Sequence, residues 1–225
     1  MRISLTMMIL AGCGNGNKTS IDAAIDATID MAPPAVDCPT YCADIQRNCT
    51  GANAQYASMD HCSATCASFA VGASKVTDSA GNTLGCRINY AVAASMMAAT
   101  QCPRAGPAGD LITGAAPAFC SGGDVCMSFC TLEIMACGSL DAPLPGDPRD
   151  STGNPLFQYR NLGDCMRLCP AWDKTHAYSP ASIGDSLACR LSAATSAAIS
   201  ITSGKIYCAY TADFPTGACA GTASP

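Results

Sequence analysis

Cysteine is the residue that sets the apolar pattern of this chain, and its spacing is helical. Cys38, Cys42 and Cys49 stand at positions i, i+4 and i+11, which places them within about 40° of one another on an α-helix. Cys62 and Cys66 repeat the four-residue step. Two CxxxC segments on antiparallel helices favour pairing of the outer cysteines with each other and of the inner ones likewise. The pattern therefore predicts the disulfides Cys38–Cys66 and Cys42–Cys62.

Polar residues ahead of the apolar stretches indicate where helices begin. Ser58 or Asp60 is a candidate N-cap for the helix that carries Cys62. A third helix is expected after GNTL (81–84), and its counterpart after GDSL (184–187), because both segments supply cap residues ahead of Ala-rich sequence. The candidate caps are Asn82, Thr83, Asp185 and Ser186.

The cysteines form two matching sets of eight, which indicates a tandem duplication. Four of the seven gaps between successive cysteines are identical in the two sets (4, 7, 4 and 20 residues). We name residues 38–122 the first copy and residues 123–225 the second copy. The expected fold is all-α, with two tandem disulfide-rich domains of about three helices each. The second copy is predicted to form Cys126–Cys169 and Cys130–Cys165, and the order of the other pairs stays open.

The N-terminus has the order of a lipoprotein signal. Arg2 precedes the short apolar or small stretch 3–10, and Leu-Ala-Gly-Cys then resembles the bacterial lipobox, which makes Cys13 the expected lipidation site. Setting Cys13 aside leaves 17 − 1 = 16 cysteines, the even number that a disulfide framework requires. We therefore predict a signal peptide at 1–12 and a flexible acidic tether at 13–37.

Composition narrows the location and the class of partner. So many cysteines favour an oxidising, extracytoplasmic compartment. The formal net charge is −5 and only 13% of residues are charged. Because phosphate binding needs clustered Lys and Arg, a nucleic-acid partner is not expected.

Two motifs suggest chemistry, and each has a simpler explanation. Gly184-Asp185-Ser186-Leu187 resembles the block of the GDSL esterases, and Asp173 with His176 supplies a D-x-x-H. The first copy has Asn82-Thr83 at the same place without a paired histidine, so a helix cap explains both copies. Metal binding is weakly supported, because Cx2C and CxxCH are absent and only two histidines exist. We predict no catalytic residue, no metal site and no cofactor. The alternatives are an extracytoplasmic metal-binding or redox protein and, after these, a GDSL-like esterase.

The first copy resembles a family of cysteine-rich, predicted outer-membrane lipoproteins of myxobacteria and related bacteria. The resemblance rests on CPTYC, QYASMDHCSATC, GNTLGCR and CPRAGPAGD, within 38–110. It implies an outer-membrane or cell-surface location and a scaffold, and no activity. Members of that family often carry histidines where this chain has Tyr90, Gln101 and Arg104.

The largest difference between the copies is the gap between the third and fourth cysteines, which is 13 residues in the first copy and 28 in the second. The extra residues form a Pro-, Gly- and Asp-rich loop between Cys137 and Cys165. Loops on a rigid scaffold are frequent recognition sites. We predict a protein or envelope partner for this loop, contacted by Asp141, Asp147, Arg149 and Asp150. The expected function is structural or partner-binding, without catalysis.

Overall fold

The chain folds into helices held together by disulfides. The computed structural model describes residues 35–71, 77–110, 119–141 and 157–221, and these ranges contain eight α-helices and no β-strand. None of these helices is long and apolar enough to cross a bilayer. The all-α prediction is therefore confirmed for the described residues. The predicted signal peptide, the tether up to residue 34 and Cys13 lie outside them.

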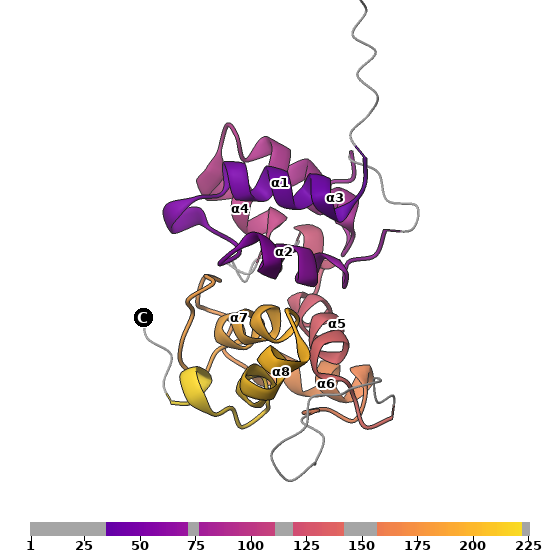
Figure 1. The fold of residues 1–225 in the computed structure, drawn as a ribbon, viewed down its shortest axis with the longest axis vertical. Helices are drawn as coiled ribbons and strands as arrows, with labels where there is room; N and C mark the ends of the chain where they lie inside the picture. Colours follow the sequence, from indigo (N-terminus) through magenta and orange to yellow (C-terminus); the bar gives the residue numbers. More distant parts are fainter. Residues whose placement is uncertain (1–34, 72–76, 111–118, 142–156, 222–225) are drawn as a thin grey trace, which may run out of the picture. The chain divides into compact units, whose positions relative to one another are not determined.

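Each copy contributes four helices rather than the expected three (Figure 1). The first copy has α1 (Cys38–Asn48), α2 (Met59–Cys66), α3 (Leu84–Ala93) and α4 (Ala98–Ala105). The second copy has α5 (Val125–Cys137), α6 (Leu162–Leu168), α7 (Leu187–Ala197) and α8 (Ile201–Tyr207). The Ala-rich stretch expected to form one long helix breaks in both copies. In the first copy the chain turns at residues 94–97, and this places Cys102 on α4 against Cys49.

Local capping explains where the helices begin. The Ser58 hydroxyl accepts the N–H of His61, so Ser58 is the cap of α2 and Asp60 lies inside its first turn. Thr83 and Ser186 cap α3 and α7 in the same way, each accepting a backbone N–H at 3.2 Å. In both copies the cap residue lies three positions before the sixth cysteine of its set.

Eight disulfides join the sixteen cysteines of the two sets, and their order is the same in both copies. The first cysteine pairs with the fifth, the second with the fourth, the third with the seventh and the sixth with the eighth. The pairs are Cys38–Cys66, Cys42–Cys62, Cys49–Cys102, Cys86–Cys120, Cys126–Cys169, Cys130–Cys165, Cys137–Cys208 and Cys189–Cys219. The four CxxxC pairs are those that the helical-hairpin geometry predicts. The sequence left the pairing of the other eight cysteines open, and the structure joins them in the remaining four disulfides.

An aromatic cluster fills the centre of each copy. Tyr41, Tyr56 and Phe69 form edge-to-face pairs in the first copy. Phe129, Tyr159 and Trp172 occupy the corresponding positions in the second. Such pairs stabilise a core beyond the area they bury. These clusters give each small copy an apolar centre that the disulfides enclose.

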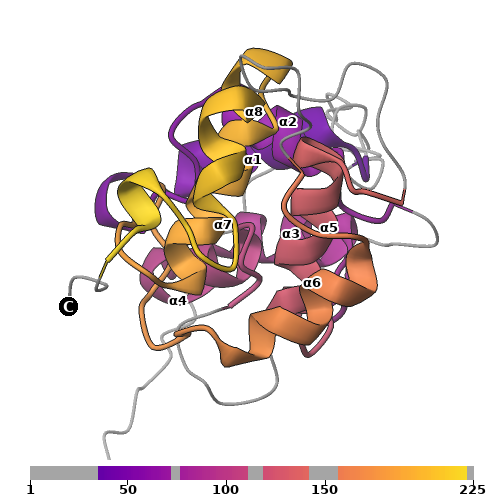
Figure 2. The same cartoon turned by 90° about the horizontal axis from the view of Figure 1, so that it is seen from below.

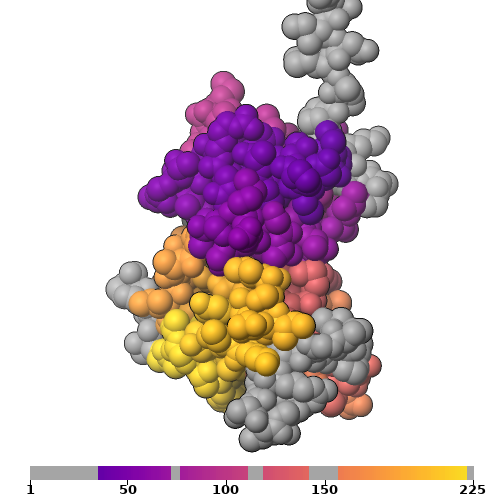
Figure 3. Space-filling view, in the orientation of Figure 1, coloured from indigo at the N-terminus to yellow at the C-terminus, as the bar shows by residue number. Residues whose placement is uncertain are grey.

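The two copies contact each other, and residues 33–225 form one compact unit. Helix α2 packs on α7 (Figure 1), and the view from below shows the second copy in front of the first (Figure 2). The space-filling view shows the indigo and yellow surfaces touching (Figure 3). The Arg87 guanidinium donates to the Ser128 hydroxyl at 3.2 Å, and Ser128 donates to the Asn82 side chain at 3.2 Å. The Tyr178 hydroxyl donates to the Gln55 carbonyl at 3.1 Å. The division into two domains at residue 122 stays a prediction.

Candidate binding site on the second copy

A cavity lies in the second copy between α7, α8 and the segment that precedes α7. We call it the α7–α8 pocket. Its volume is about 330 Å³, and its walls include the rings of Tyr207 and Tyr210, the side chains of Ser192 and Ser196, and Ile183. Pockets that hold small molecules have volumes from roughly 300 Å³ upward. The pocket is therefore large enough for a single-ring ligand.

The Tyr210 ring lies close against the backbone at Gly217. Gly217 has φ +59°, and a Cβ at this position would come within 2.1 Å of the Tyr210 ring. The Tyr207 ring lies edge-to-face with Tyr210, with centroids 5.7 Å apart. The Gly217 backbone and the Tyr207 ring thus restrict the position of the Tyr210 ring, which gives the pocket a defined shape.

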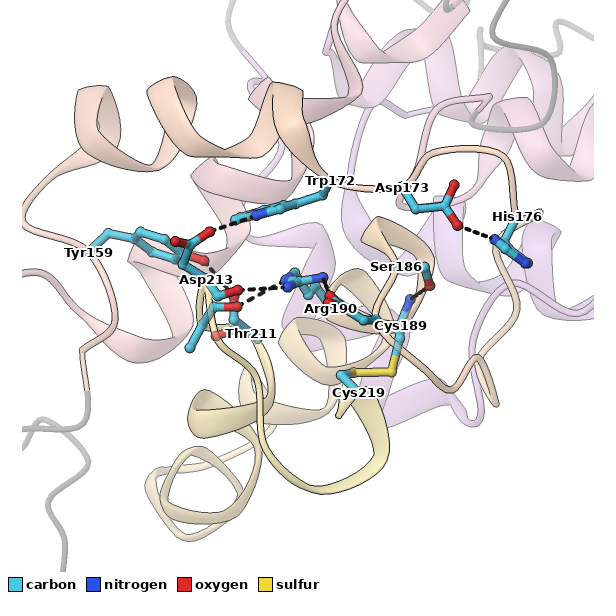
Figure 4. Close-up of polar contacts among 12 residues, drawn as sticks. Tyr159, Trp172, Asp173, His176, Ser186, Cys189, Arg190, Thr211, Asp213 and Cys219 are labelled. Carbon is cyan, nitrogen blue, oxygen red and sulfur yellow. Dashed lines mark hydrogen bonds and ion pairs between the residues drawn. A yellow bond between two sulfur atoms is a disulfide. The ribbon is translucent and has the colours of Figure 1, made fainter. Parts of the chain in front are cut away.

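The buried Arg190 joins α7 to residues 212–213 (Figure 4). Its guanidinium donates to the carbonyls of Ala212 and Asp213 at 2.9 and 3.1 Å, and it pairs with Asp185 at 2.7 Å. It also stacks over Trp172, at 4.5 Å from the ring centroid. Arg190 and its counterpart Arg87 are both 0% exposed. Both arginine side chains therefore donate to acceptors of the protein itself, and a ligand cannot reach them.

Ser186 and His176 line a second hollow, of about 330 Å³, beside the first. The Ser186 side chain is buried, and its oxygen accepts the N–H of Cys189. The His176 ring instead pairs through Nδ1 with Asp173 at 2.7 Å. Figure 4 shows this pair apart from the Ser186 hydroxyl. No hydrogen bond between Ser186 and His176 occurs in the described residues, so Ser186 is placed as a helix cap.

Asp173 is stabilised as a carboxylate by its own turn. The backbone N–H of Thr175 and then its hydroxyl, with a smaller contribution from His176, lower the pKa of Asp173. The Asp173 backbone carbonyl also accepts the N–H of Leu187, as the Ala70 carbonyl accepts that of Leu84 in the first copy. The Asp173 backbone therefore makes a hydrogen bond that both copies share.

We expect Ser186→Thr to keep the free energy of unfolding within a few tenths of a kcal/mol, because threonine also caps and occupies this place in the first copy. Ser186→Ala should lower it by about 1 kcal/mol, and Thr83→Ala should have a similar effect in the first copy. Chemical denaturation with the disulfides intact measures both losses. Hydrolysis of p-nitrophenyl acetate that disappears in Ser186→Ala, but not in Thr83→Ala, would contradict the cap assignment.

The three positions where the resembled family carries histidines come together in the first copy. The Arg104 guanidinium donates to the Gln101 side chain at 3.3 Å and stacks toward the Tyr90 ring at 5.5 Å. Arg104 also pairs with Asp110 at 3.4 Å. The Tyr90 ring and the Arg104 guanidinium supply no metal ligand at these positions. Across the described ranges, no three His, Cys, Asp or Glu side chains are grouped as a metal site.

Glu133 is a buried acidic residue among the described residues of the second copy, and the sequence pattern did not identify it. Glu133 on α5 is 0% exposed, and burial raises the pKa of its carboxyl to about 8. Neither carboxyl oxygen has a hydrogen-bond partner among the described residues, and the nearby Thr211 hydroxyl donates to the Cys208 carbonyl at 2.7 Å. Among the described residues, no Lys or Arg forms an ion pair with Glu133. A comparison of the two copies distinguishes Glu133 in the sequence, because Ile45 stands at the equivalent position in the first copy.

The candidate recognition loop is described only at its base. Asp141 pairs with Arg160 at 3.1 Å and accepts the Asn161 side chain at 2.7 Å, and these contacts lower the pKa of Asp141. Its carboxylate is thus engaged in closing the loop. The N–H groups of Leu140 and Asp141 also donate to the carbonyls of Tyr159 and Arg160. Asp147, Arg149 and Asp150 lie outside the described residues.

A protein-family model matches the first part of the chain. Residues 35–129 match the model of the BfoA family C-terminal domain, a bacterial family. This match spans the first copy and the first residues of α5. No curated protein and no solved structure matches the chain.

Proposed function

We propose that the protein is a lipid-anchored component of the bacterial outer membrane or cell surface, and that it acts by binding a partner rather than by catalysis. The observation that carries this proposal is the complete pairing of sixteen cysteines into eight disulfides. Such a framework belongs to an extracytoplasmic protein. It leaves Cys13, within the lipobox-like sequence, as the one cysteine without a place in the framework.

Two features favour binding over catalysis. The Ser186 oxygen accepts a backbone N–H as a helix cap, and the His176 ring pairs with Asp173. The residues of the esterase-like motif therefore have structural roles. The framework cysteines are joined in disulfides and are not available as thiolates for catalysis or metal binding. A rigid scaffold that presents a pocket and a loop is typical of binding proteins.

Metabolic labelling tests the anchor. The chain is produced in a Gram-negative host supplied with an alkynyl fatty acid, alongside the variant Cys13→Ala. We expect the unchanged chain to carry the label and to fractionate with membranes, and the variant to lose both properties. An unlabelled chain, or a Cys13→Ala variant that keeps its label, would overturn the proposal of lipid attachment at Cys13.

Removing residues 142–156 tests the loop as the contact with a protein partner. We expect the disulfides and the helicity to remain unchanged, because the bonds of Asp141 with Arg160 and Asn161 close the loop base. The disulfides Cys137–Cys208 and Cys130–Cys165 fix the chain on either side of it. Disulfide mapping and circular dichroism check this outcome. For a partner captured from the native envelope and then purified, we expect at least tenfold weaker binding to the trimmed chain. Equal binding would exclude the loop as the contact.

A further inference from the structure

The first copy fills, with its own side chains, the place where the second copy has the α7–α8 pocket. Tyr90 and Phe119 lie edge-to-face there, with ring centroids 5.7 Å apart. The Arg104 guanidinium covers Phe119 at 3.9 Å from the ring centroid. The Tyr90 hydroxyl donates to the carbonyl of Ser79 at 3.1 Å. Two aromatic rings and one hydroxyl therefore occupy this position in the first copy.

The second copy lacks both rings. Ala193 follows Cys189 by four residues, as Tyr90 follows Cys86, and Ala218 directly precedes Cys219, as Phe119 precedes Cys120. The framework cysteines themselves pair identically in the two copies. Methyl groups thus replace two large side chains on the same scaffold. Tyr207 and Tyr210, which stand where the first copy has Gln101 and Arg104, cover part of the space with their rings. The remainder is the pocket, which Ala193 and Ala218 line.

The chemistry of the pocket favours a neutral aromatic occupant. Its floor is buried and apolar, formed by Cys189, Ala193 and Cys219. Tyr207 and Tyr210 provide ring faces and edges, the groups with which another aromatic ring pairs most favourably. Among the residues that the structure describes, no charged side chain lines the pocket, so a charged ligand would lose its hydration without gaining a partner there.

Two hydroxyls on the pocket wall already donate to the backbone. The Ser192 hydroxyl donates to the Pro180 carbonyl at 2.7 Å, and the Ser196 hydroxyl donates to the Ser192 carbonyl at 3.1 Å. Ser182 also lines the pocket, and it stands where Ser79 accepts the Tyr90 hydroxyl in the first copy. A ligand with a ring hydroxyl would therefore meet the same backbone position that Tyr90 uses.

We infer that the α7–α8 pocket binds a small, uncharged phenol-like molecule in the place that Tyr90 and Phe119 fill in the first copy. This inference rests on the proposed binding role and names the ligand class for it. The first copy is then a closed form of the site, and the second copy is the open form.

Titration with p-cresol, which has the ring and hydroxyl of a tyrosine side chain, tests the inference. The probe is added to the ¹⁵N-labelled, oxidised full chain carrying Cys13→Ala. We expect amide shifts that saturate in the millimolar range or below and that centre on Ala193, Ser196 and Tyr207. Benzoate, a charged ring of similar size, should bind at least tenfold more weakly.

The first copy supplies the matched control. The double variant Ala193→Tyr with Ala218→Phe restores both filling side chains and should lose at least tenfold in p-cresol affinity, while its circular dichroism stays unchanged. A second variant, Ala193→Leu, fills the pocket with a smaller group and should also weaken binding. Absence of saturable shifts, or equal binding by both filled variants, would overturn the inference. Neither result would affect lipid labelling at Cys13, so failure of the pocket and failure of the anchor are distinguishable.

Discussion

Replacing Glu133 with isoleucine should remove a pH-dependent loss of stability of about 5 kcal/mol. Isoleucine is the residue that the first copy carries here, as Ile45. The Glu133 carboxyl titrates near pH 4.5 when unfolded, and burial raises its pKa to about 8 in the fold. The folded state therefore favours the protonated acid. The free energy of unfolding should fall as the pH rises from about 4.5 to about 8 and then level off.

Denaturant unfolding at pH 5 and pH 9, with the disulfides intact, measures this effect. The difference between the unchanged chain and Glu133→Ile should be small at pH 5 and largest at pH 9. Glu133→Gln, a neutral side chain of the same shape, should flatten the pH dependence in the same way. The pKa of His61 is lowered by partial burial, but His61 is present in all three proteins and its contribution cancels. The same pH dependence in all three would show that Glu133 does not titrate in this interval.

Replacing both Cys137 and Cys208 with alanine should lower the free energy of unfolding by about 4 kcal/mol. This disulfide has the largest sequence separation in the protein, 71 residues, so it removes the most conformational freedom from the unfolded chain. The Cys42–Cys62 bond spans only 20 residues and lies within the loop closed by Cys38–Cys66. Its removal should cost at most about 3 kcal/mol, because the neighbouring bond still restricts the same segment.

Guanidinium unfolding of the two alanine double variants gives this ranking, and mass spectrometry under non-reducing conditions verifies the seven remaining bonds. Both pairs are buried, so the loss of sulfur packing is similar in the two variants and does not set their order. A larger loss for the Cys42–Cys62 variant would contradict the explanation by unfolded-state entropy.

Local chemistry was predictable from the sequence, and long-range placement was not. The Cx3C spacing places both cysteines on one face of a helix. The pairs Cys38–Cys66 and Cys42–Cys62 therefore follow from the geometry of two antiparallel helices. Thr83 and Ser186 are caps for reasons confined to one helical turn. The pairing of Cys49 with Cys102 depends on where the chain turns between α3 and α4, and the Ala-rich sequence there has no strong breaker. For this reason the fourth helix of each copy was missed.

The candidate site was missed for a different reason. The α7–α8 pocket depends on the small size of Ala193 and Ala218, and alanine has no distinctive pattern in an Ala-rich helix. Its significance is visible only beside Tyr90 and Phe119 in the first copy. Glu133 was overlooked because one acid in an apolar helix resembles an ordinary surface position until its burial is known.

The hydrogen bonds between the copies bear on how the protein unfolds. Arg87 on α3 donates to Ser128 on α5, and Tyr178 donates to the Gln55 carbonyl, both within buried surroundings. Opening one copy would break these hydrogen bonds and remove the packing of α2 on α7. Each intramolecular hydrogen bond contributes about 0.5–1.5 kcal/mol to stability. Thermal unfolding should therefore be cooperative across the duplication, with one heat-absorption peak for residues 33–225 instead of two.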